Sequence, residues 1–398
     1  MSTMEQPEPP SEVLIPSLPN DIALNILARV PRRYHAVLSA VSKPFRSAVS
    51  SPQFFAIRSL LNSAENIVYL NVGSYDLSHD NWFAVHRNLS PVSNNKLLQL
   101  APVPRIPIDA QLNGSAYVAV GPKIYVLGGF TNEKGGMFLH SNVWVLDCRS
   151  HVWEHGPSMP TRCFNSKAAF LDGKLYVVGG VPSNKKSWVE VLDLAVGHWE
   201  AIPSPVYGVS IPVYGIELVD GKISIGLGEH DLRLDPMTKT WGGIENKEPL
   251  LLDDCHCVVD EVLYHSSGWR FRRFDKKIGF WKYLKGVTEG KPKYACGPKL
   301  LNLVGRLFMA FAEVRFGDTV DSKEGELHFK KKKKKKEGKF RVWCAEIDVT
   351  EDGDGDWWGR VRWSDKVPLL PERNWGSPRA HFNDKVCPYF CECLSVSL

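Results

Sequence analysis

Long hydrophobic runs are absent from this sequence of 398 residues. A membrane-spanning helix needs about 20 consecutive apolar residues, and no stretch of this chain reaches that length. The segment from Met1 to Pro10 is polar and rich in proline, without the basic and apolar regions of a secretory signal. We therefore expect a chain that neither crosses a membrane nor is exported, and that works in the cytosol, the nucleus or both.

A net positive charge is absent once one segment is set aside. The formal net charge is +5, but the unbroken run from Lys330 to Lys336 alone carries seven positive charges. The rest of the chain is close to neutral and offers no footprint for nucleic acid. The run could be a nuclear localisation signal, but a lone homopolymer of lysine is more typical of a solvated loop.

Cysteines with the spacing of a metal site are also absent. The chain has nine cysteines, an odd number, and no sign of export, so reduced thiols are expected. Neither Cys255-His256-Cys257 nor the cysteines between Cys387 and Cys393 have the paired two-residue spacing of structural zinc sites. The run from Asp352 to Asp356 resembles the start of a calcium loop, but Trp357 replaces the required glycine, which favours an acidic turn. We expect no metal and no cofactor.

Turn-forming residues and large aromatic side chains are abundant. The chain contains 13 Trp, 32 Gly and 27 Pro, which favours many short strands over long helices. The N-terminal part differs, because residues 1–14 have the composition of a disordered segment and residues 15–61 carry apolar positions at helical spacing. This pattern predicts three short helices, the second of them kinked by Pro44. Such a small module buries little area and is expected to need a partner.

A repeat begins after residue 67. An acid precedes a tryptophan by six residues four times, and the tryptophans step by 46, 42 and 40 residues. The pairs are Asp147 with Trp153, Asp193 with Trp199, Asp235 with Trp241, and Asp275 with Trp281. Upstream of each pair lies an apolar hairpin, twice with Asp-Gly at its turn, a pair that tolerates the positive φ of a type I′ turn. Units of this length with several strands predict a β-propeller, in which the Trp packs between sheets and the Asp anchors the next turn.

Two further units complete the predicted ring. The fifth is stretched by a polar insertion at residues 315–339, which we interpret as an exposed loop. The sixth combines strands near Ile67, Trp82 and Leu97 with the C-terminal segment 371–398, whose last residues are a candidate closing strand. The sequence thus predicts a small all-α module at 15–61 followed by an all-β propeller at 67–370. Six blades is the expected number, with five or seven as alternatives.

Particular residues of both parts resemble known families. The run from Asp235 to Trp241 and the glycine pairs at 128–129 and 179–180 resemble the kelch repeat, whose glycines allow close backbone approach. The runs from Ile15 to Asp21 and from Val41 to Arg46 resemble an F-box. Their combination over nearly all of residues 15–363 resembles the F-box/kelch-repeat proteins of plants.

This resemblance implies a substrate-recognition subunit of an SCF-type cullin–RING ubiquitin ligase. Its F-box would dock on the Skp-family adaptor, and the chain itself would catalyse no reaction. Its propeller would bind a target protein through loops on one face or at the mouth of the central channel. Candidate target loops are Thr131–His140, Pro182–Ser187 and Ser204–Pro212. By motif matching, the adaptor surface would use Leu18, Pro19, Ile22, Ile26, Leu27, Pro31, Leu38, Val41, Ser42 and Phe45.

Two other functions are compatible with a propeller. One is an interaction scaffold or nuclear regulatory partner without a role in ubiquitination. The other is an enzyme, since kelch repeats are similar to those of copper-containing sugar oxidases. Those enzymes are exported and need Tyr, Cys and His ligands, whereas this sequence shows no signal peptide and no partnered nucleophile. A non-catalytic protein is the better interpretation.

Overall fold

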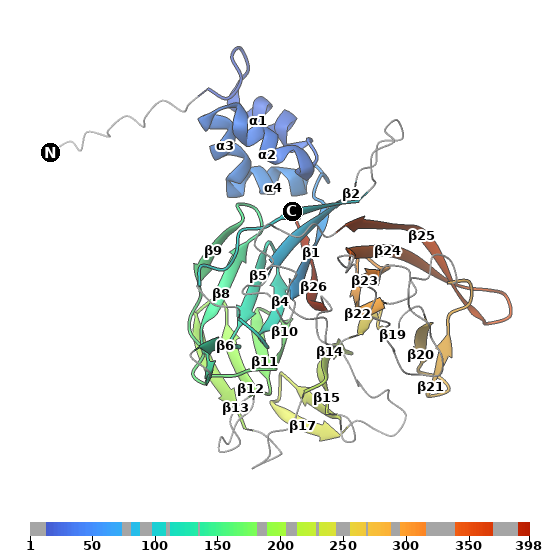
Figure 1. Ribbon diagram of the computed structural model, residues 1–398. Coiled ribbons are helices and arrows are strands. Elements are labelled where there is room, and N and C mark those ends of the chain that lie inside the picture. The colour runs from blue at the N-terminus through green and yellow to red at the C-terminus, as the bar shows by residue number, and fades with distance from the viewer. Residues whose placement is uncertain are drawn as a thin grey trace, which may run out of the picture.

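Helices at the N-terminus and a ring of small sheets make up the protein in the computed structural model (Figure 1). The described residues are 13–73, 81–87, 98–108, 112–133, 136–180, 189–203, 213–227, 231–243, 255–267, 270–287, 295–315, 339–368 and 389–398. Within them, none of the helices combines the length and apolar character that crossing a bilayer requires. No disulfide joins the cysteines of these residues.

The helical module contains four α-helices and a 3₁₀ turn rather than three helices. The predicted second helix divides at Ser42, whose extended backbone ends one helix and whose hydroxyl accepts a hydrogen bond from the Phe45 N–H at 3.2 Å, starting the next. Pro44 therefore lies in a first turn, where a missing N–H is tolerated, and it does not kink a helix. The elements are α1 (Asn20–Ala28), η1 (Arg32–Tyr34), α2 (His35–Val41), α3 (Lys43–Ser50) and α4 (Pro52–Leu60).

The start of the module lies earlier than the sequence indicated. Val13 and Leu14, which were expected to be disordered, are among the described residues. Leu14 packs against the helical core, and its backbone N–H donates to the Asn20 side chain at 3.0 Å. This contact ties Leu14 to the first residue of α1, so Leu14 belongs to the module. Residues 1–12 lie outside the described residues.

Six four-stranded antiparallel sheets form the propeller, which confirms the predicted fold and number of blades. From the inner to the outer strand, blade 1 is β26 (Tyr389–Ser397), β1 (Asn66–Gly73), β2 (Asn81–Arg87) and β3 (Leu98–Pro102). Blade 2 is β4 (Ala116–Val120), β5 (Lys123–Leu127), β8 (Val143–Asp147) and β9 (Val152–His155), with a separate hairpin of β6 (Phe130–Glu133) and β7 (Gly136–Leu139).

The other blades repeat this arrangement. Blade 3 is β10 (Lys167–Leu171), β11 (Lys174–Val178), β12 (Val189–Asp193) and β13 (His198–Ile202). Blade 4 is β14 (Gly215–Val219), β15 (Lys222–Gly226), β16 (Leu232–Asp235) and β17 (Thr240–Gly243). Blade 5 is β18 (His256–Val259), β19 (Val262–Ser267), β20 (Arg270–Asp275) and β21 (Phe280–Tyr283). Blade 6 is β22 (Ala295–Asn302), β23 (Leu307–Arg315), β24 (Lys339–Glu351) and β25 (Trp357–Pro368).

The two ends of the chain close the ring. β26 pairs antiparallel with β1, with Asn66 opposite Ser397, so the C-terminal residues supply the inner strand of blade 1. Glu65 and Leu398 exchange two backbone hydrogen bonds of 2.7 and 2.9 Å at the same place. Each inner strand contacts the inner strands of both neighbouring blades. Closure of this kind protects the sheet edges that an open propeller would expose.

The repeated Asp and Trp both act as predicted. Asp193 Oδ1 accepts from the N–H groups of Ala195 and Val196, which fixes the turn between β12 and β13. Trp199 of β13 donates through Nε1 to the Pro157 carbonyl, in the segment that leaves blade 2, at 2.9 Å. Trp153 and Trp241 make the same bond to the carbonyls of Pro104 and Pro203. Each of these three indoles therefore joins its own blade to the preceding one.

The second glycine of each predicted pair has no room for a side chain. A Cβ on Gly180 would lie 2.1 Å from the Phe164 carbonyl oxygen, and one on Gly129 would lie 2.4 Å from the Ser115 hydroxyl. Both residues also have positive φ, at 69° and 97°. Glycine is thus required on two grounds, conformation and close approach.

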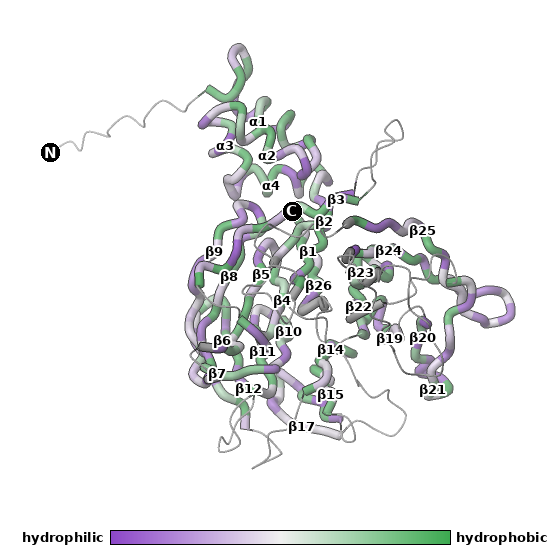
Figure 2. The backbone as a smooth tube through the Cα atoms, in the orientation of Figure 1, coloured by the Kyte–Doolittle hydropathy of each residue, from purple (hydrophilic) through white to green (hydrophobic). Residues whose placement is uncertain are grey.

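The helical module and the propeller share one hydrophobic core. Phe54 of α4 is completely buried and belongs to the same cluster as Tyr69 and Trp82 of blade 1 and Trp144 of blade 2. Figure 2 shows hydrophobic stretches along the helices, while Figure 1 shows α4 next to the propeller and α1 farther from it. The propeller therefore completes one side of the module.

Candidate functional site

The first candidate site is a set of apolar side chains that the helices expose. Ile22 and Ile26 lie one turn apart on α1 and are 45% and 48% exposed, while Val41 at the end of α2 is 62% exposed. Ala23 and Leu27, the residues next to this isoleucine pair, point into the core. The 3.6-residue period therefore places one apolar stripe of α1 inward and a second one outward.

The other residues predicted for this site occupy varied positions. Leu27 is only 5% exposed and belongs to the core, so it supports the surface from below. Ser42 is half-buried and caps α3. Pro19 is exposed, and Leu18, Pro31, Leu38 and Phe45 are half-buried.

Sequence reasoning missed two exposed residues of the same region. Tyr34 of η1 is 46% exposed and Val37 of α2 is 65% exposed. Val37 precedes Val41 by one helical turn, so the spacing could have indicated a shared face. We call Ile22, Ile26, Tyr34, Val37 and Val41 the exposed apolar set.

The second candidate site is one face of the propeller. Because strands alternate in direction, the connections between first and second and between third and fourth strands emerge on one face, the turn face. The remaining connections emerge on the other, the loop face. Turns such as Asp172-Gly173 and Asp220-Gly221 are tight and have positive φ at both residues, as the sequence predicted.

Long connections concentrate on the loop face. The chain passes from Ile202 to Gly215 between blades 3 and 4, and from Arg315 to Lys339 within blade 6. The predicted loop Thr131–His140 is the β6–β7 hairpin, where Met137 and Phe138 are 52% and 50% exposed. The loops Pro182–Ser187 and Ser204–Pro212 lie outside the described residues, as does the lysine run 330–336.

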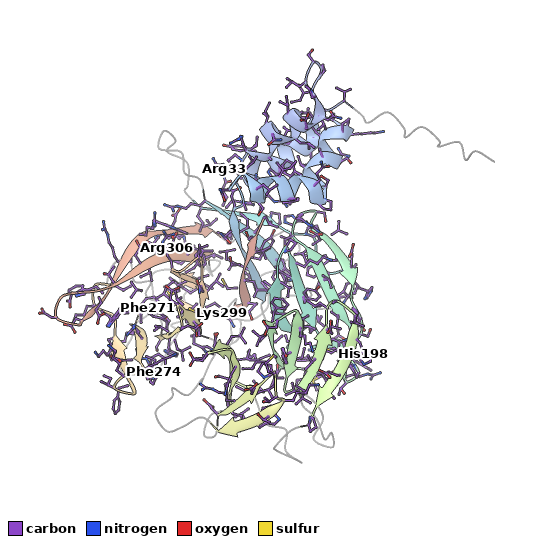
Figure 3. The ribbon with its side chains drawn as sticks, turned by 180° about the vertical axis from the view of Figure 1, so that it is seen from behind. Arg33, His198, Phe271, Phe274, Lys299 and Arg306 are labelled. Atoms are coloured by element: carbon purple, nitrogen blue, oxygen red, sulfur yellow. The ribbon has the colours of Figure 1, made fainter. Side chains whose placement is uncertain are left out.

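A central channel of about 310 Å³ is lined by the inner strands of all six blades. It contains Glu217 of β14, His256 of β18, Lys299 of β22 and Glu392 of β26. Figure 3 shows Lys299 at the middle of the ring. Burial, reinforced by the negative charge of Glu392, raises the pKa of Glu217 to about 8. Glu217 lies 3.5 Å from Nε2 of His256, so the channel is polar and carries both signs of charge.

Among the described residues, no group of three or more His, Cys, Asp or Glu side chains could hold a metal ion. Cys255 and Cys257 flank the start of β18, where Cys257 is buried and the Cys255 thiol donates to the Pro298 carbonyl. Asp352 accepts from the backbone N–H groups of Asp354 and Asp356, so this acidic run is a hydrogen-bonded turn. Cys387 and the side chain of Cys391 lie outside the described part of the structure.

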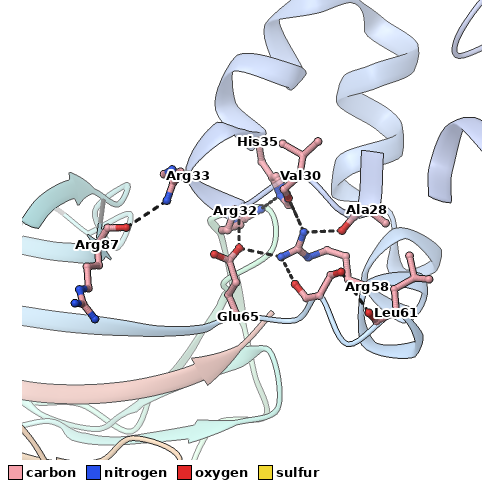
Figure 4. A network of polar contacts seen from close by, with 10 residues as sticks. Ala28, Val30, Arg32, Arg33, His35, Arg58, Leu61, Glu65 and Arg87 are labelled. Atoms are coloured by element: carbon pink, nitrogen blue, oxygen red, sulfur yellow. Dashed lines mark hydrogen bonds and ion pairs between the residues drawn. The ribbon is translucent and has the colours of Figure 1, made fainter. Parts of the chain in front are cut away.

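A polar network fixes the helical module on the turn face (Figure 4). Arg58 of α4 is 1% exposed and forms an ion pair of 2.9 Å with Glu65. It also donates to the carbonyls of Ala28 and Val30, which hold the end of α1. A buried guanidinium that pairs with a carboxylate and donates to several carbonyls stabilises the fold around it. The network therefore positions the module.

A second arginine reaches across to the propeller. Arg32 donates through Nη2 to the carbonyls of Cys148 and Arg149, in the turn between β8 and β9, at 2.8 and 2.6 Å. In the same turn, Nε2 of His151 lies 2.9 Å from the Tyr69 hydroxyl. Burial raises the pKa of Tyr69, so this hydroxyl stays protonated. The helices thus sit on the turn face, opposite the loop face.

Comparisons with known proteins agree with this architecture. Residues 82–368 match the family described as "FKB95, Kelch-repeats domain", and residues 15–57 match the F-box domain. One F-box/kelch-repeat protein of Arabidopsis thaliana is 31% identical over 376 residues, which cover 89% of this chain and 86% of the relative. A second is 31% identical over 390 residues, covering 92% and 93%.

Among solved structures, that of YjhT aligns with a TM-score of 0.44 at 12% identity, covering 73% of this chain and 94% of that one. The fold assignment rests instead on the strand pairing above. With both family matches in the observed order, F-box helices first and kelch blades after them, this chain belongs to the F-box/kelch-repeat family.

Proposed function

We propose that this chain is the substrate receptor of an SCF-type cullin–RING ubiquitin ligase, working in the cytosol or the nucleus. An F-box joined to a kelch propeller implies a substrate adaptor. In the proposal, the exposed apolar set docks on the Skp-family adaptor, together with the other residues that the sequence predicts for the adaptor surface. The loop face of the propeller binds the target protein.

The exposed apolar set is the observation that carries the proposal. Five apolar side chains between 45% and 65% exposed lie within one module of short helices. The propeller covers the side of α4 and leaves them uncovered. Apolar surface concentrated in this way is typical of a protein–protein interface, where it would be removed from water when the adaptor binds.

The placement of the module supports the second half of the proposal. The helices contact the turn face through Arg32, and the long connections, apart from the one between β2 and β3, emerge from the opposite face. A target on the loop face would not compete with the adaptor for space. The chain would form and break no covalent bond. It would raise the local concentration of a target lysine near the ubiquitin-carrying subunit.

The experiment is a binding measurement between the purified full chain and a Skp-family adaptor. A charge at Ile22 or Ile26, as in Ile22→Asp with Ile26→Asp, should weaken binding at least about 100-fold, because it places an unpaired carboxylate in an apolar contact. Leu60→Asp is the matched control. Leu60 is apolar and 83% exposed on α4 but lies outside the exposed apolar set, so binding should be retained.

The result that would overturn the proposal is a folded wild-type chain that does not bind the adaptor. Equal loss of binding in the Leu60 control would show that the effect is not specific to this surface. Quantitative proteomics of cells that lack the protein separates a ligase receptor from a scaffold. Targets of a receptor become more abundant, whereas partners of a scaffold keep their levels.

A further inference from the structure

A cavity of about 910 Å³ lies where the helical module meets the propeller. Its walls come from η1, α2 and α3 on one side, and from β2, β3 and the turn between β8 and β9 on the other. Arg33, labelled in Figure 3, lies at this junction. Small-molecule sites of about 300–1,000 Å³ form preferentially at boundaries between domains. Neither the adaptor surface nor the loop face includes this cavity.

The lining of this junction cavity is basic. It contains Arg32, Arg33 and Arg149, and no Asp or Glu is among the described residues that line it. Arg149 is paired with Asp147, so its charge is neutralised. The hydrogen bonds of the Arg32 guanidinium go to backbone carbonyls and to Nδ1 of His35. Among the described residues no carboxylate is hydrogen-bonded to that guanidinium, although Glu65 and Asp147 lie close enough to act on its charge.

Arg33 has the strongest remaining capacity for an anion. Its Nη1 donates to the Arg87 carbonyl at 3.3 Å, and its guanidinium lies 4.8 Å from the centre of the Tyr34 ring. Its Nε is buried and has no hydrogen-bond partner in the described part of the chain. A buried charged donor without a partner is costly, and a bound anion would satisfy it.

The pKa values of three histidines in the cavity are lowered by burial and by the charge of Arg32. Burial lowers the pKa of His35 to about 3 and of His151 to about 4, and the positive charge of Arg32 acts in the same direction. Burial and Arg32 also lower the pKa of His86. The rings are therefore neutral at physiological pH, and the charge of the cavity comes from its arginines.

We propose that the junction cavity binds a small polyanion, a metabolite carrying two or more phosphate or carboxylate groups, through Arg33 and Arg32. Guanidinium groups bind both kinds of oxyanion in bidentate geometry. The walls belong to both parts of the protein, so the ligand would contact the module and the propeller together. Binding would stabilise their relative position, and with it the orientation of the adaptor surface to the loop face.

The test uses the full chain with inorganic pyrophosphate and with citrate as separate probes, in calorimetric titrations at constant ionic strength. We expect saturable binding of at least one probe, and the tighter one identifies phosphate or carboxylate as the preferred group. Arg33→Gln should weaken binding at least about tenfold, because a charge-assisted hydrogen-bond donor is lost. Arg29→Gln is the matched control, since Arg29 is exposed on the same module but does not line the cavity.

Each result of these titrations either supports or overturns the polyanion proposal. Absence of saturable binding for both probes overturns the proposal, and so does an equal loss of affinity in Arg29→Gln, which would indicate nonspecific charge attraction. If Arg33→Gln fails to fold, Arg33→Lys keeps the charge and should still bind several-fold more weakly, because lysine lacks the planar fork. Ile22→Asp should leave polyanion binding unchanged, so this test does not depend on whether the adaptor binds.

Discussion

On the helices, apolar side chains point to both sides, whereas on the strands of the propeller they fill cores between blades. Ile26 of α1 is 48% exposed although its neighbour Leu27 is 5% exposed. In β8 and β12, by contrast, Val143, Leu146 and Leu192 are completely buried. Each blade has a neighbour on either side, so the ring covers both faces of every sheet. The module has the propeller on one side only, and its remaining apolar surface is available to another protein.

The difference between inward and outward apolar side chains can be tested first on α1, where the largest effect on stability is expected. Leu27→Ala should lower the free energy of unfolding by about 3 kcal/mol, because it leaves a cavity in the shared core. Ile26→Ala should change it by less than about 0.5 kcal/mol, because the side chain is half exposed. Chemical denaturation of both variants, followed by circular dichroism, gives the two values. Similar losses would show that the outward stripe of α1 is structural.

Much of the propeller could be predicted from the sequence because its signals are local. The Asp of each repeat bonds to the turn that follows it, as Asp235 does with the N–H groups of Met237 and Thr238. The type I′ turns depend on two adjacent residues. Ring closure is the exception, since β1 pairs with β26 from the opposite end of the chain, and the sequence offered only an apolar C-terminal segment as a candidate. The fixed phase between Asp and Trp marked four of the six blades, and the other two had to be assembled from apolar strands.

The junction and the details of the docking surface could not be predicted. The bond from Arg32 to the Arg149 carbonyl joins residues 117 positions apart, and neither residue shows this in its own sequence context. The division of the second helix at Ser42 depends on a capping bond that competes with helix continuation. Matching to the F-box treated Ile26 and Leu27 alike, because a motif does not record burial. Only the packing of α1 on α4 separates them.

The bonds between blades should contribute less than the shared core. Trp199→Phe keeps most of the ring but removes the donor to the Pro157 carbonyl. We expect a loss of about 1 kcal/mol in the free energy of unfolding, the usual value for one hydrogen bond. The same substitution at Trp153, which donates to the Pro104 carbonyl, should give a similar loss. Adaptor binding should be unchanged in both variants, and a loss there would mean that module and propeller are coupled more tightly than their contacts indicate.

The channel differs from the rest of the ring, because polar groups replace the apolar packing found elsewhere. The pKa of Glu217 is raised to about 8 from an ordinary value of 4.5. Between these values the folded protein keeps a proton that the unfolded chain loses, so Glu217 makes stability fall as the pH rises from about 5 to about 8. Glu217→Gln should flatten this dependence by part of the roughly 1.4 kcal/mol per pH unit that one whole proton gives. Thermal unfolding at several pH values measures the slope. An unchanged slope in Glu217→Gln would mean that the carboxylate is ionised in the folded protein, stabilised by His256 at 3.5 Å.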